Sequence, residues 1–474
     1  MASKPKIAII GSGFAGFGAS HALSGENVDA TIYEKRPVHG GHTSTHAYDD
    51  GYLFDEGPHI SFTEDKRLQE LFADSLGGTF ERLRAYVDNF WQGHFIKHPA
   101  QTSLYGLPTE LVVKCITDFV EATKTPIEDA RIENYEDWLL AAFGEGFART
   151  FPMEYTKKYH STEAKNLTTD WLGPRLYRPT LEQVLVGALD KKSPDVHYVD
   201  HFRYPTHGGF VSYLNGFRER ANLEVNSEIV AIDPVARTLT MSDGRVKPYD
   251  ALVSSVALPS LIPMIKGAPD DVKAAAEKLA CTEVVLVNIG VTKPFIKDAH
   301  WTYFYDEDIC FARLSYPSNF SPNVAPKGCS ALQAEVYFSK KWKPRTKPAD
   351  AYIEPVIDGL LRAGLIDSRE QVNHTSTIVA PYANIIFDHD RPAAVKLIHD
   401  YLDDIGIAYC GRFGDWGYIW TDQAFTSGEH AARKALERLS APERGAIAGG
   451  VLCAASAPIS PSCAAARHRC ITTG

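Results

Sequence analysis

The sequence predicts an α/β fold in which a Rossmann-type nucleotide-binding domain is interleaved with a second, α+β domain. Three observations lead to this prediction: a strand, a glycine-rich turn and a helix at the N-terminus, short apolar strands that recur in the second half of the chain, and a strand–glycine–helix element near its end. At 474 residues the chain is also longer than one hydrophobic core usually supports, so two domains are expected.

The N-terminal element begins with Lys6–Ile10, a short isoleucine-rich run that is typical of a β-strand. Three glycines follow, and each has a mechanical reason in a dinucleotide-binding turn. Gly11 permits the tight turn, Gly13 lets a pyrophosphate approach the backbone, and Gly16 lets the helix pack closely on the strand. The order of these parts predicts a phosphate-binding turn.

The helix after this turn would offer the free N–H groups of its first residues, Phe14 and Ala15, to phosphate oxygens. A second strand, Asp29–Tyr33, ends at Glu34, where an acid can accept hydrogen bonds from a ribose diol. Because strand, glycines, helix, strand and acid follow one another within about 30 residues, a chance glycine turn is the weaker interpretation.

The residues after the second strand favour FAD over NAD. Lys35 and Arg36 are followed by a double glycine that ends at Gly41, and then by His42. A double glycine with a nearby arginine resembles the second phosphate- and flavin-contacting loop of glutathione-reductase-type FAD enzymes. A typical NAD domain would instead pass directly into another helix. The resemblance therefore implies an FAD-binding domain of the glutathione-reductase type.

A further loop, Gly57-Pro58-His59, continues this pattern, because a glycine there would let the backbone approach an isoalloxazine ring. Two interpretations of His59 stay open: an ordinary loop histidine, or a side chain next to the flavin.

The middle of the chain predicts a mainly helical insertion, because helical periodicity runs through Pro108–Ala122 and Glu136–Phe151. Strands are expected after it. The predicted strands are Leu223–Asp233 (which includes Ile229), Arg237–Ser242, Val246–Val256, and the alternating segments 283–293 and 331–338. The chain closes on a strand, Ile407–Tyr409, then Gly411 and Asp415, and a helix from about Asp422, which is the usual closing element of an FAD domain.

These segments divide the chain into two discontinuous domains. We expect an FAD-binding domain from residues 1–80, 195–260 and 395–440, and an α+β substrate domain from residues 81–194 and 261–394. Residues 441–474 are rich in Ala, Ser, Pro and Cys and contain no Phe, Trp or Tyr, so they predict a disordered or atypical tail.

Composition excludes several classes of protein. A net charge of -10 argues against non-specific nucleic-acid binding. No apolar run reaches the roughly 20 residues that span a bilayer. The eight cysteines form no Cys-x-x-Cys pair, which suits reduced thiols and indicates neither a metal site nor a disulfide framework. We expect a cytoplasmic protein that acts on a small molecule, while its oligomeric state stays open.

Four further stretches carry a family resemblance. They are residues 90–99 with Leu107-Pro108, residues 135–138 with 155–159 and 170–175, residues 320–323, and residues 411–418. Together with the N-terminal turn, they resemble the flavin amine-oxidase superfamily, in the branch of UDP-galactopyranose mutase-like and protoporphyrinogen-oxidase-like proteins. The resemblance covers about residues 5–437.

Mutases of this branch hold a sugar-nucleotide diphosphate with two arginines and a pair of tyrosines. The resemblance places Arg175 and Tyr418 at one position of each kind, Arg313 at the second arginine, and Tyr382 nearest to the second tyrosine. Two arginines could grip a diphosphate bidentately.

The uridine-contacting helix departs from the family pattern. Its Asn and Trp are Thr156 and His160 in this chain, so a diphosphate site is expected while a uridine site is not. Tyr155, Tyr159 and Trp171 could line a pocket for a ring-shaped substrate, with core packing as the alternative for each.

Three hypotheses on function follow. The first is an FAD-dependent oxidoreductase of the amine-oxidase superfamily, the second a redox-neutral flavin-dependent sugar-nucleotide mutase that interconverts pyranose and furanose rings, and the third a non-catalytic flavin-binding scaffold. The first is placed slightly ahead, on the habits of the superfamily. The expected catalytic residues are His59 and Arg175. The expected cofactor-binding residues are Gly11, Gly13, Phe14, Ala15, Gly16, Glu34, Lys35, Arg36, Gly41, His42, Gly57, Pro58, Ile229, Gly411, Arg412, Asp415 and Asp422, and the expected substrate-binding residues are Tyr155, Tyr159, Trp171, Arg175, Arg313 and Tyr418.

Overall fold

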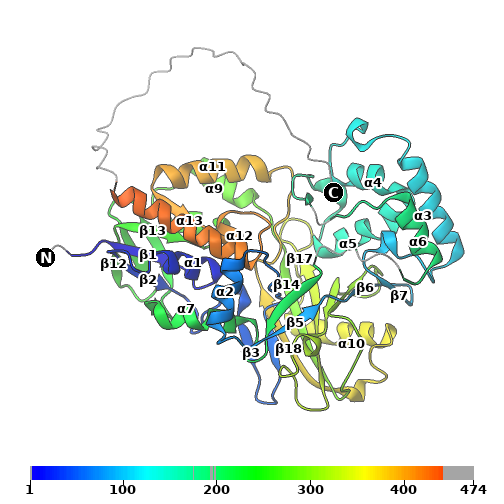
Figure 1. The fold of residues 1–474 in the computed structure, drawn as a ribbon. Coiled ribbons are helices and arrows are strands. Elements are labelled where there is room, and N and C mark those ends of the chain that lie inside the picture. The colour runs from blue at the N-terminus through cyan, green and yellow to red at the C-terminus, as the bar shows by residue number, and fades with distance from the viewer. Residues whose placement is uncertain (1–2, 174–175, 193–195, 197–198, 441–474) are drawn as a thin grey trace, which may run out of the picture. The chain divides into compact units, whose positions relative to one another are not determined.

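A five-stranded parallel sheet carries the predicted nucleotide-binding turn. The computed structural model describes residues 3–173, 176–192, 196 and 199–440, and those of them up to residue 439 form one compact unit (Figure 1). The strand order is β19–β13–β1–β2–β9. These strands are β1 (Lys6–Ile10), β2 (Asp29–Tyr33), β9 (Leu223–Glu224), β13 (Ala251–Ser254) and β19 (Ile407–Tyr409). The predicted α/β fold with a Rossmann-type sheet is confirmed.

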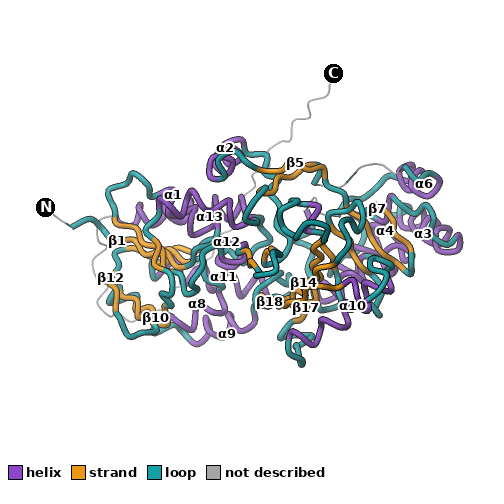
Figure 2. Tube along the Cα trace, turned by 90° about the horizontal axis from the view of Figure 1, so that it is seen from below, coloured by secondary structure: helices purple, strands orange, loops and turns teal. Residues whose placement is uncertain are grey.

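Helices cover both faces of this sheet. Successive side chains of β1 point to opposite sides and so pack against different helices. Ile7 and Ile9 lie in one apolar cluster and Ala8 and Ile10 in another. The first cluster includes residues of α1 (Phe14–Ala22), α2 (Lys66–Ser75), α7 (Asn215–Arg220) and α13 (Thr421–Ser440). The second includes residues of α8 (Leu258–Met264), α9 (Asp270–Lys278) and α11 (Arg391–Asp404). Figure 2 shows α1 and α13 on one side of the sheet and α8 and α9 on the other.

The prediction of one strand over Leu223–Asp233 is wrong. The segment forms β9 in the parallel sheet and a separate strand, β10 (Ile229–Asp233), and Asn226 between them has a left-handed φ of 51°. The predicted segment Val246–Val256 is likewise two strands, of which only β13 joins the parallel sheet. The antiparallel sheet beside it contains β10, β11 (Thr238–Met241) and β12 (Val246–Pro248).

A seven-stranded sheet forms the second large element, in the order β18–β14–β17–β16–β15–β6–β7. Its strands are β6 (Val87–Trp91), β7 (His94–Lys97), β14 (Glu283–Val291), β15 (Trp301–Phe304), β16 (Arg313–Ser315), β17 (Ser330–Phe338) and β18 (Val372–Ala380). The predicted strands at 283–293 and 331–338 are present as β14 and β17, and although their sequences alternate between apolar and polar residues, both strands are buried along almost their whole length. The reason is that α10 (Ile353–Arg362) packs on one face while aromatic side chains that include Tyr159 cover the other.

The predicted helical insertion is present. It contains α3 (Thr109–Ala122), α4 (Tyr135–Thr150), α5 (Pro152–Tyr159) and α6 (Leu181–Leu189). Helices α3 and α4 approach closely at Gly146, where a Cβ atom would lie 2.9 Å from the Cα atom of Cys115. These helices lie at the opposite end of the unit from β1 and β2 (Figure 1). The two-domain boundaries stay a prediction, and the predicted tail, 441–474, lies outside the described residues.

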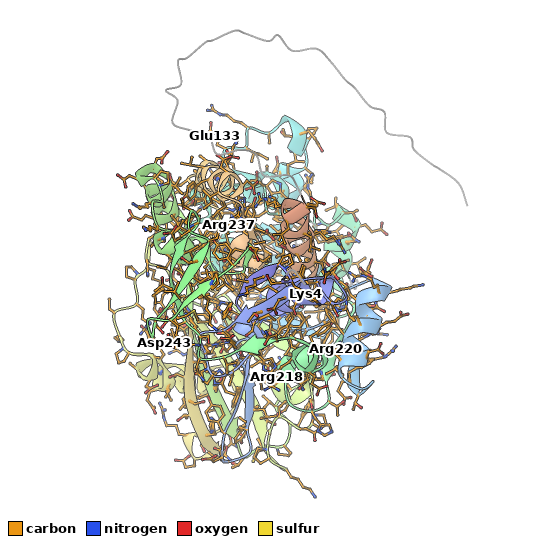
Figure 3. The ribbon with its side chains drawn as sticks, turned by 90° about the vertical axis from the view of Figure 1, so that its left-hand side faces the viewer. Lys4, Glu133, Arg218, Arg220, Arg237 and Asp243 are labelled. Carbon is orange, nitrogen blue, oxygen red and sulfur yellow. The ribbon has the colours of Figure 1, made fainter. Side chains whose placement is uncertain are left out.

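Two small sheets complete the fold. They pair β3 (Thr45–Ala47) with β4 (Leu53–Asp55) and β5 (Phe80–Arg84) with β8 (His201–Pro205). Charged side chains of both signs, such as Lys4, Arg237 and Asp243, point outward (Figure 3). Among the residues that the structure describes, no helix is long and apolar enough to cross a membrane.

Lowering the pH should destabilise the fold through His300. This side chain is 6% exposed, its Nδ1 accepts a hydrogen bond from the Tyr86 N–H at 3.0 Å, and burial lowers its pKa to about 4. A folded-state pKa below the unfolded value means that stability present above pH 6.5 is lost as the pH falls toward 4. At pH 5 the loss should be about 2 kcal/mol.

The variant His300→Gln can still accept the bond but does not titrate. We expect its melting temperature to fall less between pH 7.5 and pH 5 than that of the wild type. Equal falls in the two proteins would show that His300 does not carry this pH dependence.

Candidate cofactor and substrate site

The glycine turn after β1 contains glycines of two kinds. Gly11 has a φ of +98°, and a Cβ atom on Gly16 would lie 1.9 Å from the Gly11 carbonyl oxygen, so the fold itself requires both. Gly13 has an ordinary φ of -83°, and a Cβ atom on it would meet nothing closer than 3.8 Å. The protein alone therefore does not require glycine at residue 13, whereas a ligand that approaches the backbone would.

Glu34 is fixed at the end of β2. Its side chain is 6% exposed, and Oε2 accepts hydrogen bonds from the N–H and the hydroxyl of Ser12 at 3.0 and 2.7 Å. Oε1 accepts one bond, from the Arg36 N–H at 2.9 Å. Each carboxylate oxygen has more than one acceptor direction, so this geometry holds the acid in place and leaves capacity for a hydroxyl donor.

Arg36 fastens the double-glycine loop to this end of the sheet. Its guanidinium donates to Glu56 at 2.6 Å, to the Gly41 carbonyl at 2.5 Å and to the Ser44 hydroxyl at 2.8 Å. His42, which follows Gly41, packs its ring 5.1 Å from that of Phe413. Burial lowers the pKa of His42 to about 4. Lys35 is exposed. Of the two basic residues, only Arg36 is built into the loop.

The loop with Gly57, Pro58 and His59 follows a buried acid. Asp55 accepts hydrogen bonds from the Tyr204 hydroxyl at 2.7 Å and the Phe210 N–H at 3.0 Å, and burial raises its pKa to about 6. His59 donates from Nδ1 to the Gly57 carbonyl at 3.0 Å. Burial, with Arg412 nearby, lowers the pKa of His59 to about 4, so its ring is neutral at pH 7. The remaining predicted cofactor residue of the middle segment, Ile229, is buried in the core at the start of β10.

The terminal motif meets the N-terminal turn directly. Gly411 has a φ of +78°, and a Cβ atom on it would lie 2.8 Å from the Cβ of Ala15. The Gly411 N–H donates to the Ser427 hydroxyl at 3.0 Å, and that hydroxyl donates to Asp415 at 2.5 Å. Segments from the two ends of the chain therefore share one site.

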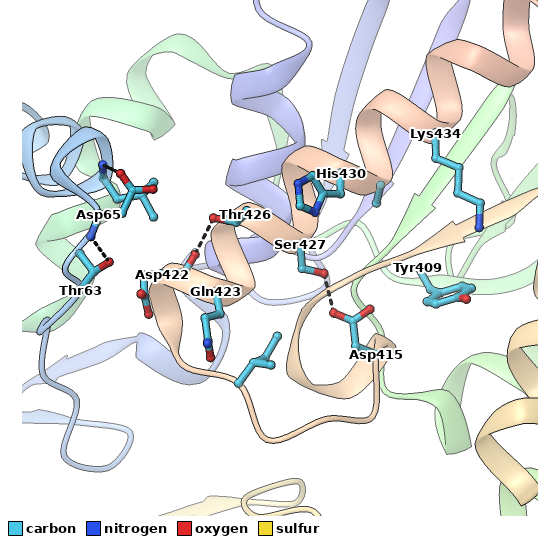
Figure 4. A pocket seen from close by; sticks show the side chains of 13 residues that line it. Thr63, Asp65, Tyr409, Asp415, Asp422, Gln423, Thr426, Ser427, His430 and Lys434 are labelled. Atoms are coloured by element: carbon cyan, nitrogen blue, oxygen red, sulfur yellow. Dashed lines mark hydrogen bonds between the residues drawn. The ribbon is translucent and has the colours of Figure 1, made fainter. Parts of the chain in front are cut away.

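Asp415 and Asp422 line a crevice of about 550 Å³ along α13, which also includes Asp65, His430 and Lys434 (Figure 4). Its described lining contains no residue of the glycine turn. Whether either aspartate contacts the cofactor therefore stays a prediction.

A second cavity, of about 180 Å³, lies among the helical insertion, the large sheet and the terminal motif. The predicted residues Tyr155, Tyr159, Trp171, Arg313 and Tyr418 all line it. Further lining residues that the sequence analysis did not single out are His98, Tyr135, Phe143, Phe147, Phe151, Tyr303 and Tyr305.

Not every tyrosine that the resemblance points to lines this cavity. Tyr382 is not among the described residues that line this cavity, and its hydroxyl bonds that of Ser260 at 2.7 Å. Tyr303 does line it, from β15. The spacing of Tyr303 and Tyr305, which both line the cavity, was the available signal, because residues two apart on an extended chain face the same side. Arg175 lies outside the described residues.

Arg313 is the partly buried cation among the described residues that line this cavity, and Glu335 neutralises it. Two hydrogen bonds of 2.8 and 2.7 Å join them, and Glu335, 1% exposed, also accepts from the Tyr337 hydroxyl at 2.7 Å. Burial alone would lower the pKa of Arg313, but the carboxylate beside it holds that pKa above the ordinary value. The pair is thus charged and neutral in sum.

The cavity also presents phenol hydroxyls. Tyr159 donates to Asn384 Oδ1 at 2.9 Å, and its oxygen lies 3.1 Å from that of Tyr418. Burial raises the pKa of Tyr155, Tyr159 and Tyr303, so these groups stay protonated and can donate hydrogen bonds.

The two residues at the departure from the family pattern are also buried. The Thr156 hydroxyl donates a hydrogen bond to the Pro152 carbonyl within α5, at 2.7 Å. His160 is 4% exposed, burial lowers its pKa to about 4, and its Nδ1 has no hydrogen-bond partner among the described residues.

A double-mutant cycle on Arg313 and Glu335 should show that the two side chains contribute to the free energy of unfolding as a pair. Arg313→Met would leave the buried Glu335 carboxylate without its partner, at a cost of about 3–5 kcal/mol. Glu335→Met, which leaves the partly buried Arg313 unpaired, should cost less, and the double variant should recover most of the loss. Urea unfolding would measure it. Arg131→Met, which breaks an exposed pair with Glu133, is the matched control and should change stability by less than about 0.5 kcal/mol. Additive losses in the double variant would show that the two groups do not act as a pair.

Comparisons with known proteins agree with this geometry. Residues 9–75 match the family described as an NAD(P)-binding Rossmann-like domain. The crystal structure of a reduced UDP-galactopyranose mutase is similar over 93% of this chain and 97% of its own, with 26% identity and a TM-score of 0.86.

Two other similar structures show the fold alone. Cyclohexylamine oxidase from Brevibacterium oxydans has 13% identity, a TM-score of 0.65 and coverage of 92% of this chain and 100% of its own. A fatty acid isomerase from P. acnes has 13% identity and a TM-score of 0.62, with coverage of 92% and 99%. The nucleotide-binding sheet, the terminal motif and these matches along the chain together show that the protein has the flavoprotein amine-oxidase fold.

Proposed function

We propose that the protein binds FAD at the turn between β1 and α1. Three features support this: the space above Gly13, the fixed carboxylate of Glu34, and the loop that Arg36 fastens at Gly41. In this proposal the first N–H groups of α1 hold the pyrophosphate and Glu34 a ribose. The loops at Gly57 and Gly411 supply backbone close to the rest of the cofactor. FAD, when bound, supplies the electron-transfer chemistry of the site.

The reaction that the cavity supports best is the redox-neutral isomerisation of a sugar nucleotide. The observation that carries this proposal is the gathering of Arg313 with the tyrosines Tyr155, Tyr159, Tyr303 and Tyr418 in the lining of one cavity. An arginine and neutral phenols are donors, and phosphate and sugar oxygens are acceptors. The similarity to a UDP-galactopyranose mutase over nearly the whole chain supports the same substrate class.

The cavity residues would then have separate tasks. Arg313 would bind a phosphate oxygen with the N–H groups that Glu335 does not use, and the tyrosines would orient the sugar. The rings of Phe143, Phe147 and Phe151 would exclude water and pack against the flat end of the nucleotide.

Oxidation of a small substrate is the second candidate, and one observation favours it. Arg313 is the one arginine among the described lining residues, and Glu335 already neutralises it, which suits a less anionic substrate. The superfamily fold is also found in oxidases, among them the cyclohexylamine oxidase.

Gly13→Val tests the cofactor site. Its side chain should occupy the ligand's approach without disturbing the fold, because residue 13 has an ordinary φ and no close neighbour. We expect loss of the flavin absorbance of the purified protein, with the melting temperature of the apoprotein unchanged. Ser24→Val, exposed just beyond the same helix, is the control and should keep its flavin. Full flavin content in Gly13→Val would refute the proposed site.

Reduction with dithionite tests the reaction. The anaerobic protein, oxidised or reduced, is mixed with UDP- and dTDP-hexopyranoses, and the products are separated by chromatography. We expect ring-size isomers from the reduced protein alone, with the flavin still reduced afterwards, because a redox-neutral reaction leaves the cofactor in the state in which it began. Bleaching of the oxidised protein by a substrate, with no isomer in either state, would instead establish the oxidoreductase.

A further inference from the structure

The turn that carries Tyr418 is strained. It follows α12 (Gly411–Gly414), and Trp416 within it has a φ of 47°, a left-handed conformation that bulky residues rarely adopt. The Trp416 side chain is fully buried, and its indole Nε1 has no hydrogen-bond partner among the described residues. Such a conformation persists only where the surroundings hold it.

Arg391 holds this turn from outside. It is the first residue of α11, its side chain is 14% exposed, and both Nε and Nη2 donate to the Trp416 carbonyl, at 3.1 and 2.6 Å. The guanidinium also lies 4.2 Å from the centre of the Phe387 ring, and that ring lies 6.5 Å from the ring of Tyr418. Asp170 is 3.4 Å from Nη1, so two neighbours, Phe387 and Asp170, orient the fork that faces Trp416.

Arg412 closes the same turn at its other end. Its Nε and Nη2 donate to the Ile419 carbonyl at 2.9 and 2.7 Å, and its guanidinium lies 5.1 Å from the Tyr418 ring. Tyr418 is thus carried between two backbone carbonyls that arginines hold. Its hydroxyl meets that of Tyr159 in the substrate cavity, at 3.1 Å.

We propose that Arg391 is a positioning residue for Tyr418. By holding the Trp416 carbonyl it keeps the strained turn in the one conformation that places the Tyr418 hydroxyl beside Tyr159. This inference rests on the proposed function, in which Tyr418 contacts the substrate. Arg391 itself is not among the described residues that line the substrate cavity. Arg412 is less suitable for a test, since it belongs to the expected cofactor residues.

Binding of UDP, measured by titration calorimetry on the purified flavoprotein, tests the proposal. We expect Arg391→Leu to weaken binding about tenfold, the size of one lost charge-assisted hydrogen bond. The UDP affinity of Arg391→Lys should fall between those of the wild type and Arg391→Leu, because one ammonium donor can still reach the Trp416 carbonyl but cannot form two hydrogen bonds to it. Arg345→Leu is the matched control: this arginine also bonds a carboxylate and a backbone carbonyl, of Glu283 and Lys347, away from the cavity. It should bind UDP within about twofold of the wild type.

A positioning role also predicts an effect that a purely structural role does not predict. In a Tyr418→Phe background the hydroxyl is gone, so Arg391→Leu should then cause no further loss of UDP binding, although it still lowers the melting temperature. Equal losses in the two backgrounds, or wild-type binding by Arg391→Leu, would overturn the proposal.

Hydrogen exchange separates this proposal from the proposed substrate. Without any ligand, amides 412–420 should exchange faster in Arg391→Leu than in the wild type and in Arg345→Leu. If the wild-type protein binds neither UDP nor dTDP, the proposed substrate class fails, and the exchange result alone decides on Arg391. Unchanged exchange of amides 412–420 in Arg391→Leu would refute the proposal that Arg391 holds the turn.

Discussion

The whole arrangement depends on one constraint: helix α1 is in backbone contact with its neighbours on two sides. A Cβ atom on Gly16 would lie 1.9 Å from the Gly11 carbonyl oxygen, and one on Gly18 would lie 2.1 Å from that of Phe425. From the other helix, a Cβ on Gly428 would lie 1.9 Å from the Ala15 carbonyl oxygen. No other residue permits such an approach, so glycines alone bring α13 against α1. The last helix of the described chain is thereby held at the first nucleotide-binding turn.

This contact brings the terminal motif to the cofactor side of the sheet. Gly411 meets Ala15, Phe413 packs on His42, and the strained turn that follows carries Tyr418 to the substrate cavity. One short segment of the chain therefore faces both proposed sites. A small displacement of that segment would alter both, which explains why two arginines, Arg391 and Arg412, hold its carbonyls.

The electrostatics of the cavity set what it can bind. Arg313 and Glu335 form a buried pair that is neutral in sum, and the surrounding tyrosines are donors that stay protonated. A carboxylate that orients an arginine makes it a directional donor and reduces its attraction for anions at the same time. The cavity is therefore suited to a ligand whose oxygens match fixed donor directions, as sugar and phosphate oxygens do.

The sequence alone determined the nucleotide-binding fold, because its signals are local. Glycine spacing, the strand Lys6–Ile10 and the acid Glu34 all lie within one short segment, where backbone geometry follows directly from residue type. The closing strand Ile407–Tyr409 and the helical insertion were predictable for the same reason. By contrast, the segment Leu223–Asp233 has the composition of one strand, and only pairing with β2 and β11 divides it in two.

The second cavity, which we propose as the substrate site, was decided by tertiary structure. Its lining comes from the helical insertion, the large sheet and the terminal motif, and nothing local in the sequence states which of many tyrosines meet there. Strand register and sheet order bring Tyr303 to the described lining of the cavity and leave Tyr382 out of it. The partner of Arg313 is 22 residues away on a neighbouring strand, and the contacts of Arg391 with the turn at Trp416 depend on how α11 packs beside it. Residue types supply the donors, but only packing brings donors from distant segments within hydrogen-bond distance.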